Sequence, residues 1–282
     1  MNNSSPPLDP LPSDPRSGPA GGPGRSAAAA RRIPPFQLAS VVALGLAGLA
    51  LGLGSKLAAG LVAGGWFLLM GLGIACPRLS WFGPFLCRGR AGLKWVALTF
   101  DDGPDARSTP ALLDLLREHG VQATFFCVGR RVAEEPALAA RMVREGHLLG
   151  NHSYHHSNVT NFFTLPRLRE ELSRTQQAIT EATGTAPRWF RPPMGLSNPR
   201  VFQAAHSLGL SVIGWTARGL DTVTANPERI VARIRRGLQP GAIILLHDGN
   251  IPPERLLVTV KLLLDTLRTG GYQVVRLDRI LT

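Results

Sequence analysis

The longest hydrophobic pattern in the chain lies near the N-terminus, where residues 36–76 are mostly apolar and carry a single charged side chain, Lys56. A transmembrane helix needs about 20 apolar residues. The stretch can therefore hold two spans, at 36–54 and 57–76, with a turn at 53–56 between them. It has no polar face, which argues against a pair of buried helices in a soluble protein. The pattern predicts a transmembrane helical hairpin.

The segments around this hairpin predict its orientation. Residues 1–35 are rich in Pro, Gly, Ser and Ala without periodicity, which predicts a disordered tail. Because this long polar tail precedes the apolar stretch, and because the stretch is longer than the apolar region of a signal peptide, we do not expect a cleavable signal peptide. Positive charges lie on both sides of the hairpin, at Arg31, Arg32, Arg78, Arg88, Arg90 and Lys94. Because positive flanks favour the cytoplasm, we expect a plasma (inner) membrane protein whose following domain faces the cytoplasm. If only one span inserts, that domain would face outside.

Residues 77–93 are expected to form a juxtamembrane linker, with Trp81, Phe82 and Phe85 as anchors at the membrane interface. From 94 to 282, short apolar runs alternate with amphipathic segments, which predicts one α/β domain with a parallel barrel or a doubly wound sheet. Polar residues repeatedly follow the predicted strands, which favours a barrel. The predicted elements include strands at 95–98, 121–128, 210–214, 243–246 and 273–277, and helices at 135–145, at 165–183 and after a Ser108 cap.

Two adjacent carboxylates, Asp101 and Asp102, follow the first of these strands in the sequence TFDDGP. Gly103 and Pro104 are turn formers that would end the strand there. Adjacent like charges raise each other's proton affinity unless a cation lies close by. The pair is therefore a candidate for binding a metal ion.

Two histidines, His152 and His156, supply the remaining ligands of a candidate metal site. They are spaced i,i+4, and on one helical turn this spacing would direct both imidazoles to the same point. One carboxylate and two imidazoles form an open zinc set that leaves a position for water. Asp102 would be the carboxylate ligand, and Asp101 would be free to accept a proton from that water. His247, at the end of a later strand, could protonate a departing nitrogen.

Three further segments, around Arg191-Pro192-Pro193-Met194-Gly195, Trp215 with Asp221, and His247-Asp248-Gly249, follow predicted strands in this order. Together with TFDDGP and HxxxH, they resemble the five motifs of the polysaccharide deacetylase family, also called carbohydrate esterase family 4 or NodB-like. The resemblance extends from about residue 93 to the C-terminus. It implies a distorted (β/α) barrel with about seven strands.

The resemblance also implies a role for each motif residue. Asp101 is the general base and His247 the general acid, while Asp102, His152 and His156 bind the metal. Arg191 pairs with Asp101, and Asp221 bonds to His247 and raises its pKa. The backbone N–H of Met194 stabilises the oxyanion, and Leu245 lines the pocket for the acetyl methyl group. The metal is expected to be zinc, with cobalt, nickel or manganese as alternatives.

Two positions depart from the family pattern. Met194 stands where the family usually has an aromatic residue, and Thr222 stands where a Trp follows the fourth-motif Asp. A backbone donor survives the first change. The second removes an aromatic residue from the substrate groove, which makes ordinary chitin-like substrates less certain to fit.

The formal net charge of +12 is typical of proteins that bind nucleic acid or an anionic membrane. No helix-turn-helix, zinc-finger or aromatic-basic pattern accompanies it, so we expect a membrane partner and no nucleic acid. The three cysteines, Cys76, Cys87 and Cys127, form no disulfide framework and no CxxC pair. The net positive charge, without a nucleic-acid-binding pattern, therefore supports the prediction of a membrane hairpin.

These observations lead to three functional hypotheses. The first is a metal-dependent hydrolase that removes an N-acetyl group from an amino sugar of a polysaccharide or glycan. The second is a deformylase or deacetylase that acts on a polyprenyl-linked sugar at the membrane. The third is a non-catalytic carbohydrate-binding scaffold. The complete set of candidate ligands, acid and base favours an enzyme, while the sequence does not specify an oligomeric state.

Overall fold

The computed structural model describes residues 34–90 and 92–281 of the chain. Apart from its last two residues, the predicted tail at 1–35 lies outside this part. Two apolar helices come first, α1 (Pro35–Gly52) and α2 (Lys56–Ala75). Both are long and apolar enough to cross a membrane, and only Ala59 and Gly73 among their residues are buried. They pack against each other, and the Trp66 indole N–H donates to the Ser40 hydroxyl at 3.0 Å.

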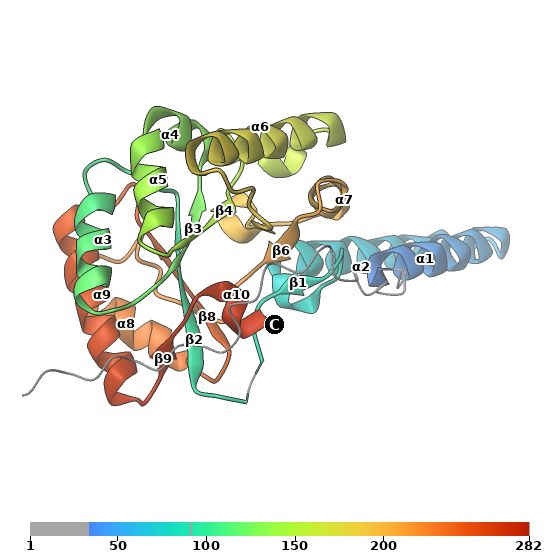
Figure 1. Ribbon diagram of the computed structural model, residues 1–282. Helices are drawn as coiled ribbons and strands as arrows, with labels where there is room; N and C mark the ends of the chain where they lie inside the picture. The colour runs from blue at the N-terminus through green and yellow to red at the C-terminus, as the bar shows by residue number, and fades with distance from the viewer. Residues whose placement is uncertain (1–33, 91, 282) are drawn as a thin grey trace, which may run out of the picture. The chain divides into compact units, whose positions relative to one another are not determined.

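The helices and strands after the hairpin form an α/β barrel whose sheet has nine strands among the described residues (Figure 1). The strands are β1 (Phe85–Leu86), β2 (Trp95–Asp101), β3 (Thr124–Cys127), β4 (Leu148–Asn151), β5 (Trp189–Phe190), β6 (Ser211–Ile213), β7 (Ala217–Arg218), β8 (Ala242–His247) and β9 (Gln273–Val274). The helices are α3 (Thr109–Glu118), α4 (Gly129–Glu134), α5 (Pro136–Arg144), α6 (Leu165–Thr183), α7 (Pro199–Ser207), α8 (Pro227–Arg236), α9 (Pro253–Thr269) and α10 (Leu277–Leu281).

The strands pair in the order β1-β6-β5-β4-β3-β2-β8-β7, with β9 joined to β2, and all of these pairs are parallel. Within the described residues, the end strands β1 and β7 do not pair with each other. Instead, Arg88 forms an isolated bridge with Ala242 at the start of β8. The distorted (β/α) barrel expected from the sequence is thereby confirmed, with irregular closure at β1, β7 and β8.

The barrel core explains why these segments form strands. Every residue of β2 after Trp95 is buried, as is most of β8, because one side of each strand faces the barrel interior and the other faces helices. Phe100 and Phe125 stack at 5.2 Å between ring centroids on the helix side. The β2–β8 register runs from Val96 opposite Ala242 to Asp101 opposite His247. This register brings two candidate catalytic side chains to the same end of the barrel.

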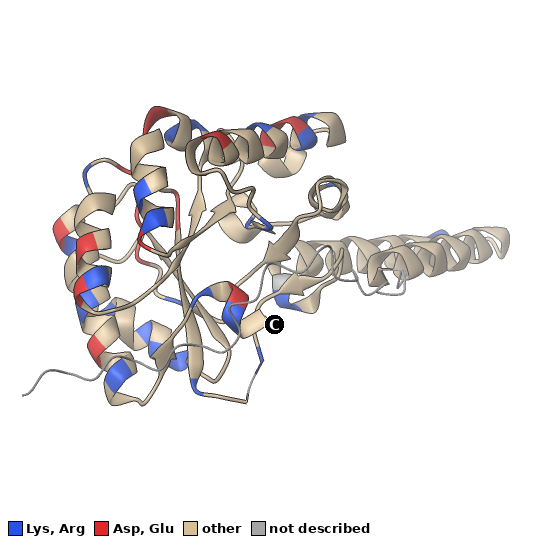
Figure 2. Cartoon of the chain, viewed as in Figure 1, with Lys and Arg blue, Asp and Glu red and all other residues tan. Residues whose placement is uncertain are grey.

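Charged side chains are distributed unevenly over the described residues (Figure 2). The two apolar helices contain one charge, Lys56 at the first position of α2, while Lys, Arg, Asp and Glu are spread over the barrel helices. The amphipathic helix α8 has Arg233, Arg235 and Arg236 in its last turn, where positive charges interact favourably with the helix dipole. The surface of the hairpin is therefore almost uncharged, whereas the surface of the barrel is charged.

Several local predictions differ from the structure. The Ser108 side chain makes no cap bond to α3 and instead donates to the backbone carbonyl of Asp248. The helix predicted at 135–145 is α5, and α4 precedes it without having been predicted. The strand predicted at 273–277 ends at Val274, and Leu277 begins α10. Short helical turns and two-residue strands leave too little periodicity to be read from sequence.

The segment at 77–93, predicted as a linker, contributes to the sheet. Its strand β1 pairs with β6, and Phe82 and Phe85 are 5% and 6% exposed. Phe82 packs against Phe36, and Phe85 contacts Phe202 edge-on. The prediction that these two residues are interfacial anchors is wrong, because their rings are buried within the protein.

Candidate metal centre and acid–base site

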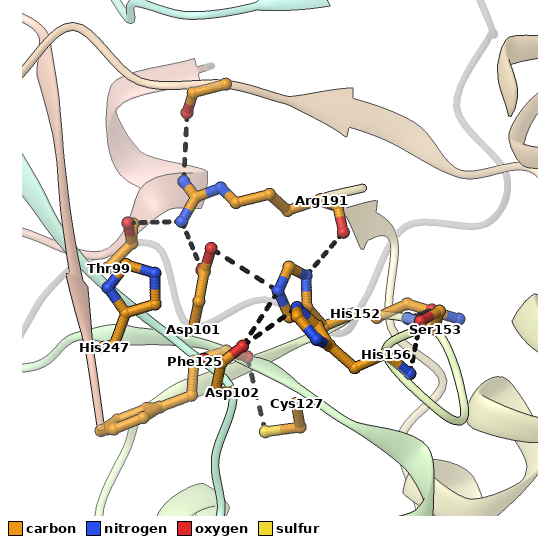
Figure 3. A network of polar contacts seen from close by, with 12 residues as sticks. Thr99, Asp101, Asp102, Phe125, Cys127, His152, Ser153, His156, Arg191 and His247 are labelled. Carbon is orange, nitrogen blue, oxygen red and sulfur yellow. Dashed lines mark hydrogen bonds and ion pairs between the residues drawn. The ribbon is translucent and has the colours of Figure 1, made fainter. Parts of the chain in front are cut away.

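The two adjacent carboxylates lie at the carboxyl end of β2, on the barrel edge where the other candidate residues also gather (Figure 3). Asp101 is the last residue of β2, and Asp102 follows it with φ of 75°, a left-handed conformation. Successive side chains of a regular strand point to opposite faces. The left-handed residue ends the strand and lets both carboxylates approach the same histidine, His152.

Asp102, His152 and His156 form a group that could hold a metal ion. Their candidate ligand atoms lie within 4.8 Å of one another. The distance from Asp102 Oδ1 is 3.4 Å to His152 Nε2 and 3.2 Å to His156 Nε2. Tetrahedral zinc with ligands at about 2.0–2.1 Å requires neighbouring ligand atoms roughly 3.4 Å apart. The observed spacing therefore matches a shared cation.

The hydrogen bonds around this group support the same interpretation. Asp102 Oδ1 is buried and, within the described part of the chain, has no hydrogen-bond partner of good geometry, although both imidazoles lie nearby. His152 Nδ1 lies 2.7 Å from the carbonyl oxygen of Arg191, which can only accept. Nδ1 must then carry a proton, which leaves Nε2, on the side of Asp102, as the ring atom that a metal ion could bind. A metal ligand held by a neighbouring carbonyl in this way has a fixed tautomer and ring orientation.

The two histidines come from a loop and not from a helix. His152 directly follows β4, and the chain passes through positive φ angles at Ser153 and His156. The Ser153 hydroxyl accepts a hydrogen bond from the His156 N–H at 3.2 Å. The prediction of one helical turn is therefore wrong, although the rings do converge, with centroids 4.8 Å apart. A tight loop brings the i and i+4 side chains together here.

A buried carboxylate, Glu171 of α6, fixes this ligand loop. Its Oε2 accepts the backbone N–H groups of Tyr154 and His155, and its Oε1 lies 2.6 Å from His155 Nδ1. Glu171 is 5% exposed. The sequence predictions did not include this residue. Glu171 directly follows Glu170 on an amphipathic helix, and nothing in this local pattern indicates that one of the two supports a loop 15 or more residues earlier.

Burial and charge set the protonation of the candidate ligands. Burial opposes ionisation of Asp102, but the adjacent His152 and His156 hold the pKa of its carboxyl well below its usual range. Burial and the neighbouring His152 lower the pKa of His156, which favours the neutral imidazole that binds metals. For His152, burial acts downward, while Asp101 and Asp102 raise its pKa. A cation in the group would displace a proton from this histidine.

Asp101 is held by a fully buried arginine, Arg191. The Nη1 group of Arg191 donates to Asp101 Oδ1 at 2.7 Å and to the Thr99 hydroxyl at 2.8 Å, and Nη2 donates to the carbonyl of Gly214 at 3.1 Å. The guanidinium also lies 4.1 Å from the centre of the Phe126 ring. With one oxygen paired to Arg191, Asp101 keeps Oδ2 at 3.7 Å from His152 Nε2, beside the metal group.

The second candidate proton-transfer group is His247, the last residue of β8. Its Nδ1 lies 3.0 Å from Asp221 Oδ1, and its backbone N–H donates to Asp221 Oδ2 at 2.8 Å. Burial acts to lower the pKa of His247, but the hydrogen bond and charge of Asp221 outweigh it and raise the pKa to about 9. The imidazole is therefore protonated at neutral pH.

These groups surround one cavity of about 250 Å³. Leu245 of β8, 6% exposed, forms part of its wall, and Met194, 60% exposed, lies at its rim. Met194 has φ of 58° within the short turn Pro193–Gly195. Thr222, which follows Asp221, also lines the cavity. The structure thus brings all nine sequence-predicted residues to one place, with Arg191 just behind the wall and the other eight lining the cavity.

A further buried carboxylate, Asp248, supports this site from behind. Its backbone N–H donates to the carbonyl of Asp101 at 3.0 Å, and its Oδ2 accepts the Thr109 hydroxyl at 2.8 Å. The other oxygen, Oδ1, is buried without a partner next to Gly103, where an added Cβ would overlap the carboxylate. Burial raises the pKa of Asp248 to about 7. The sequence showed Asp248 only as a turn residue after His247.

Fold and site together define a distorted parallel (β/α) barrel with an Asp-His-His group and a paired acid and base at the carboxyl ends of its strands. Residues 88–213 match the family model described as polysaccharide deacetylase. A chitooligosaccharide deacetylase of Bradyrhizobium sp. (strain ANU 289) is 37% identical over 191 residues, which cover 67% of this chain and 87% of that protein. The chain belongs to the polysaccharide deacetylase family.

Two other similar proteins show the range within this family. The peptidoglycan-N-acetylglucosamine deacetylase PgdA of Listeria monocytogenes is 36% identical over 187 residues, and the match covers 66% of this chain but only 39% of that protein. The crystal structure of BA3943 from Bacillus anthracis, described as a CE4 family pseudoenzyme, matches with a TM-score of 0.65 and 30% identity, over 71% of this chain and 69% of that chain. The shared fold therefore does not by itself establish activity.

Proposed function

We propose that this protein is a metal-dependent hydrolase that removes an N-acetyl group from an amino sugar of a glycan. The observation that carries the proposal is the joint presence, around one cavity, of the Asp102-His152-His156 group, the Arg191-paired Asp101 and the Asp221-paired His247. The relatives named as chitooligosaccharide and peptidoglycan deacetylases support the same substrate class. The pseudoenzyme relative makes the intact acid–base pair the deciding feature.

In this proposal, Asp102, His152 and His156 hold a divalent cation, with zinc favoured by the donor set and cobalt, nickel or manganese as alternatives. Such a cation polarises an acyl carbonyl and acidifies a water molecule. Asp101, which accepts a hydrogen bond from Arg191, takes the proton of the water molecule that attacks the carbonyl carbon. Arg191 also fixes the orientation of the Asp101 carboxylate.

His247 then donates a proton to the sugar nitrogen as the C–N bond breaks. The products are acetate and a free amine, and Asp221 stabilises the imidazolium before the transfer. The backbone N–H of Met194 supports the developing oxyanion, and Leu245 receives the acetyl methyl group. Each of the nine residues named from the sequence thus has a task in the proposed reaction.

The test replaces Asp101 with Asn in the full-length protein and measures acetate release from chitooligosaccharides. General-base removal typically costs 10²–10⁴-fold in rate, so we expect kcat to fall by about 10³-fold with the metal content unchanged. Undiminished release would contradict the proposed role of Asp101. Absence of release by the unmodified, metal-loaded protein would favour the scaffold hypothesis.

A second candidate is deacetylation or deformylation of a polyprenyl-linked sugar at a membrane. The two apolar helices α1 and α2 are the observation that favours it, because they would hold the barrel near such a substrate. We propose a plasma membrane location with two spans, the tail at 1–35 and the catalytic domain at 94–282 on the cytoplasmic side. A reporter fused to the C-terminus tests this topology, and an externally located reporter would contradict it.

A further inference from the structure

A second cavity adjoins the catalytic cavity and shares part of its wall. It has a volume of about 310 Å³ and lies between the end of α2 and strands β6 and β7. Trp215 and Arg218 line both cavities. A ligand in the second cavity would therefore lie next to a ligand in the catalytic one.

Two arginines, Arg78 and Arg218, give the second cavity a positive charge. The Nη2 group of Arg78 donates to the carbonyl oxygen of Thr216 at 2.6 Å, which fixes the guanidinium at the cavity wall. The guanidinium of Arg218 lies 6.0 Å from the centre of the Trp215 ring. Both arginines are exposed residues that line this cavity.

No acidic residue lines this second cavity, and within residues 34–90 and 92–281 neither arginine has a carboxylate within ion-pair distance. This distinguishes them from the buried Arg191, which pairs with Asp101, and from Arg141, which pairs with Asp114 and Glu145. Guanidinium groups without a carboxylate partner bind phosphate oxygens through paired N–H donors. The cavity has the charge and the donors for an anionic ligand.

The position of Arg78 in the chain indicates where that anion would come from. Arg78 is three residues after Ala75, the last residue of the candidate span α2. If α2 crosses a membrane, its end lies at the depth of lipid-borne phosphates. A substrate phosphate at this depth would be joined on one side to a sugar in the catalytic cavity and on the other side to a lipid carrier in the membrane.

We propose that the second cavity, here called the Arg78–Arg218 pocket, binds the phosphate of a substrate whose N-acyl amino sugar is joined to a phosphate ester. This inference rests on the proposed deacetylase function. The acyl group occupies the catalytic cavity, and the phosphate lies beyond the shared wall of Trp215 and Arg218. The same chemistry would be presented by a soluble sugar phosphate or by a sugar on a lipid phosphate.

The experiment compares matched substrates with the full-length, metal-loaded protein in detergent or phospholipid vesicles. The soluble pair is N-acetylglucosamine 1-phosphate and methyl N-acetylglucosaminide. The lipid arm uses polyprenyl diphosphate N-acetylglucosamine in phosphatidylcholine vesicles, and chitooligosaccharides give the neutral baseline. For each protein, the readout is the ratio of kcat/KM for the phosphorylated substrate to kcat/KM for the neutral one.

We expect a ratio of about tenfold or more for the unmodified protein, since a hydrogen bond to a charged group contributes ~1.5–3 kcal/mol and 1.4 kcal/mol is tenfold. The variants Arg78→Gln and Arg218→Gln each remove one guanidinium and should lower this ratio about tenfold through KM. Arg90→Gln removes an exposed cation from the same segment but outside the pocket, and it should leave the ratio unchanged. A preference only in the lipid arm identifies the lipid carrier as the source, and a preference in both arms identifies the phosphate itself.

The proposal is overturned if the unmodified protein shows no preference for phosphate in either arm, or if both arginine variants keep the preference. Equal losses in Arg90→Gln would also overturn it, because they would reflect general charge at the membrane surface. In each of these cases chitooligosaccharides would still be deacetylated. Loss of acetate release from every substrate, by contrast, would refute the proposed function.

Discussion

The two sides of the catalytic cavity use the same residue types in opposite ways. On one side, His152 Nδ1–H donates a hydrogen bond to the neutral carbonyl of Arg191, and Nε2 faces a buried carboxylate oxygen of Asp102. On the other, His247 turns Nδ1 toward the carboxylate of Asp221, and its pKa rises to about 9. The partner of Nδ1 decides whether an imidazole is prepared to bind a cation or to carry a proton.

The largest expected effect comes from breaking the metal side with His152→Ala. If Asp102, His152 and His156 hold a metal ion as proposed, loss of one of the three ligands should release it, together with the several kcal/mol of charge stabilisation that such an ion supplies. We therefore expect kcat/KM to fall by about 10³-fold or more. Metal content of the purified protein should fall with it, as measured by elemental analysis. Arg90→Gln is a control that should retain both metal and activity; full metal content in His152→Ala would contradict the ligand assignment.

The next largest effect comes from Asp221→Asn, which acts on the acid side alone. The neutral amide can still accept the His247 N–H but no longer stabilises the imidazolium, so the pKa of His247 should fall from about 9 toward its ordinary 6.5. The acid form is lost above the pKa, so the alkaline limb of the rate profile moves down in pH. At pH 8 the protonated fraction would fall about 30-fold.

The pH dependence of kcat/KM measures this shift, and the rate near pH 5.5 serves as the internal control because His247 is protonated there in both proteins. Metal affinity should not change. An alkaline limb at the same pH in both proteins would show that His247 is not the acid that limits the rate.

A smaller effect, and one that reaches both sides, is expected from Asp248→Ala. Asp248 follows His247, its N–H bonds to Asp101, and its side chain packs beside Gly103 and accepts from Thr109. Leaving the Thr109 hydroxyl proton without an acceptor should cost about 1–3 kcal/mol of unfolding free energy, although the hydroxyl oxygen still accepts the Asp105 N–H. We also expect an activity loss of about tenfold as the turn after Asp102 loosens. Thermal unfolding and acetate release test this.

Thr109→Val is the control for that variant, because it leaves the carboxylate beside Gly103 while it removes the hydrogen bond to Asp248 and the one that the Thr109 hydroxyl accepts from the Asp105 N–H. We expect it to reproduce the loss of stability but little of the loss of activity. If both variants lost the same activity, the bond to Thr109 alone would account for the effect, and Asp248 would have no separate positioning role.

The sequence predicted the barrel and all nine candidate site residues because both depend on local patterns: apolar runs, turn residues after strands and short motifs. It did not predict Glu171 or Asp248, whose contacts join segments distant in the chain. It also assigned a helical turn to His152 and His156, since i,i+4 spacing cannot distinguish a helix from a tight loop with positive φ angles. The burial of Phe82 and Phe85 depends on β1 joining the sheet, which two residues of pattern could not indicate.

The smallest expected effect comes from Glu171→Gln, which loosens the metal side without touching the acid side. The amide can keep one acceptor for the Tyr154 and His155 N–H groups but loses the charge that holds His155 Nδ1. Groups that orient metal ligands typically contribute 10–100-fold to affinity, and Glu171 acts one step further away, so we expect a decrease of about three- to tenfold. Titration against a competing chelator measures this decrease in metal affinity.

At saturating metal, kcat and the alkaline limb of the pH profile of Glu171→Gln should match those of the unmodified protein, in contrast to Asp221→Asn. A shifted alkaline limb in Glu171→Gln would show that the two sides of the cavity are coupled, and that the separation of ligand and proton-carrying histidines is less complete than their hydrogen bonds indicate.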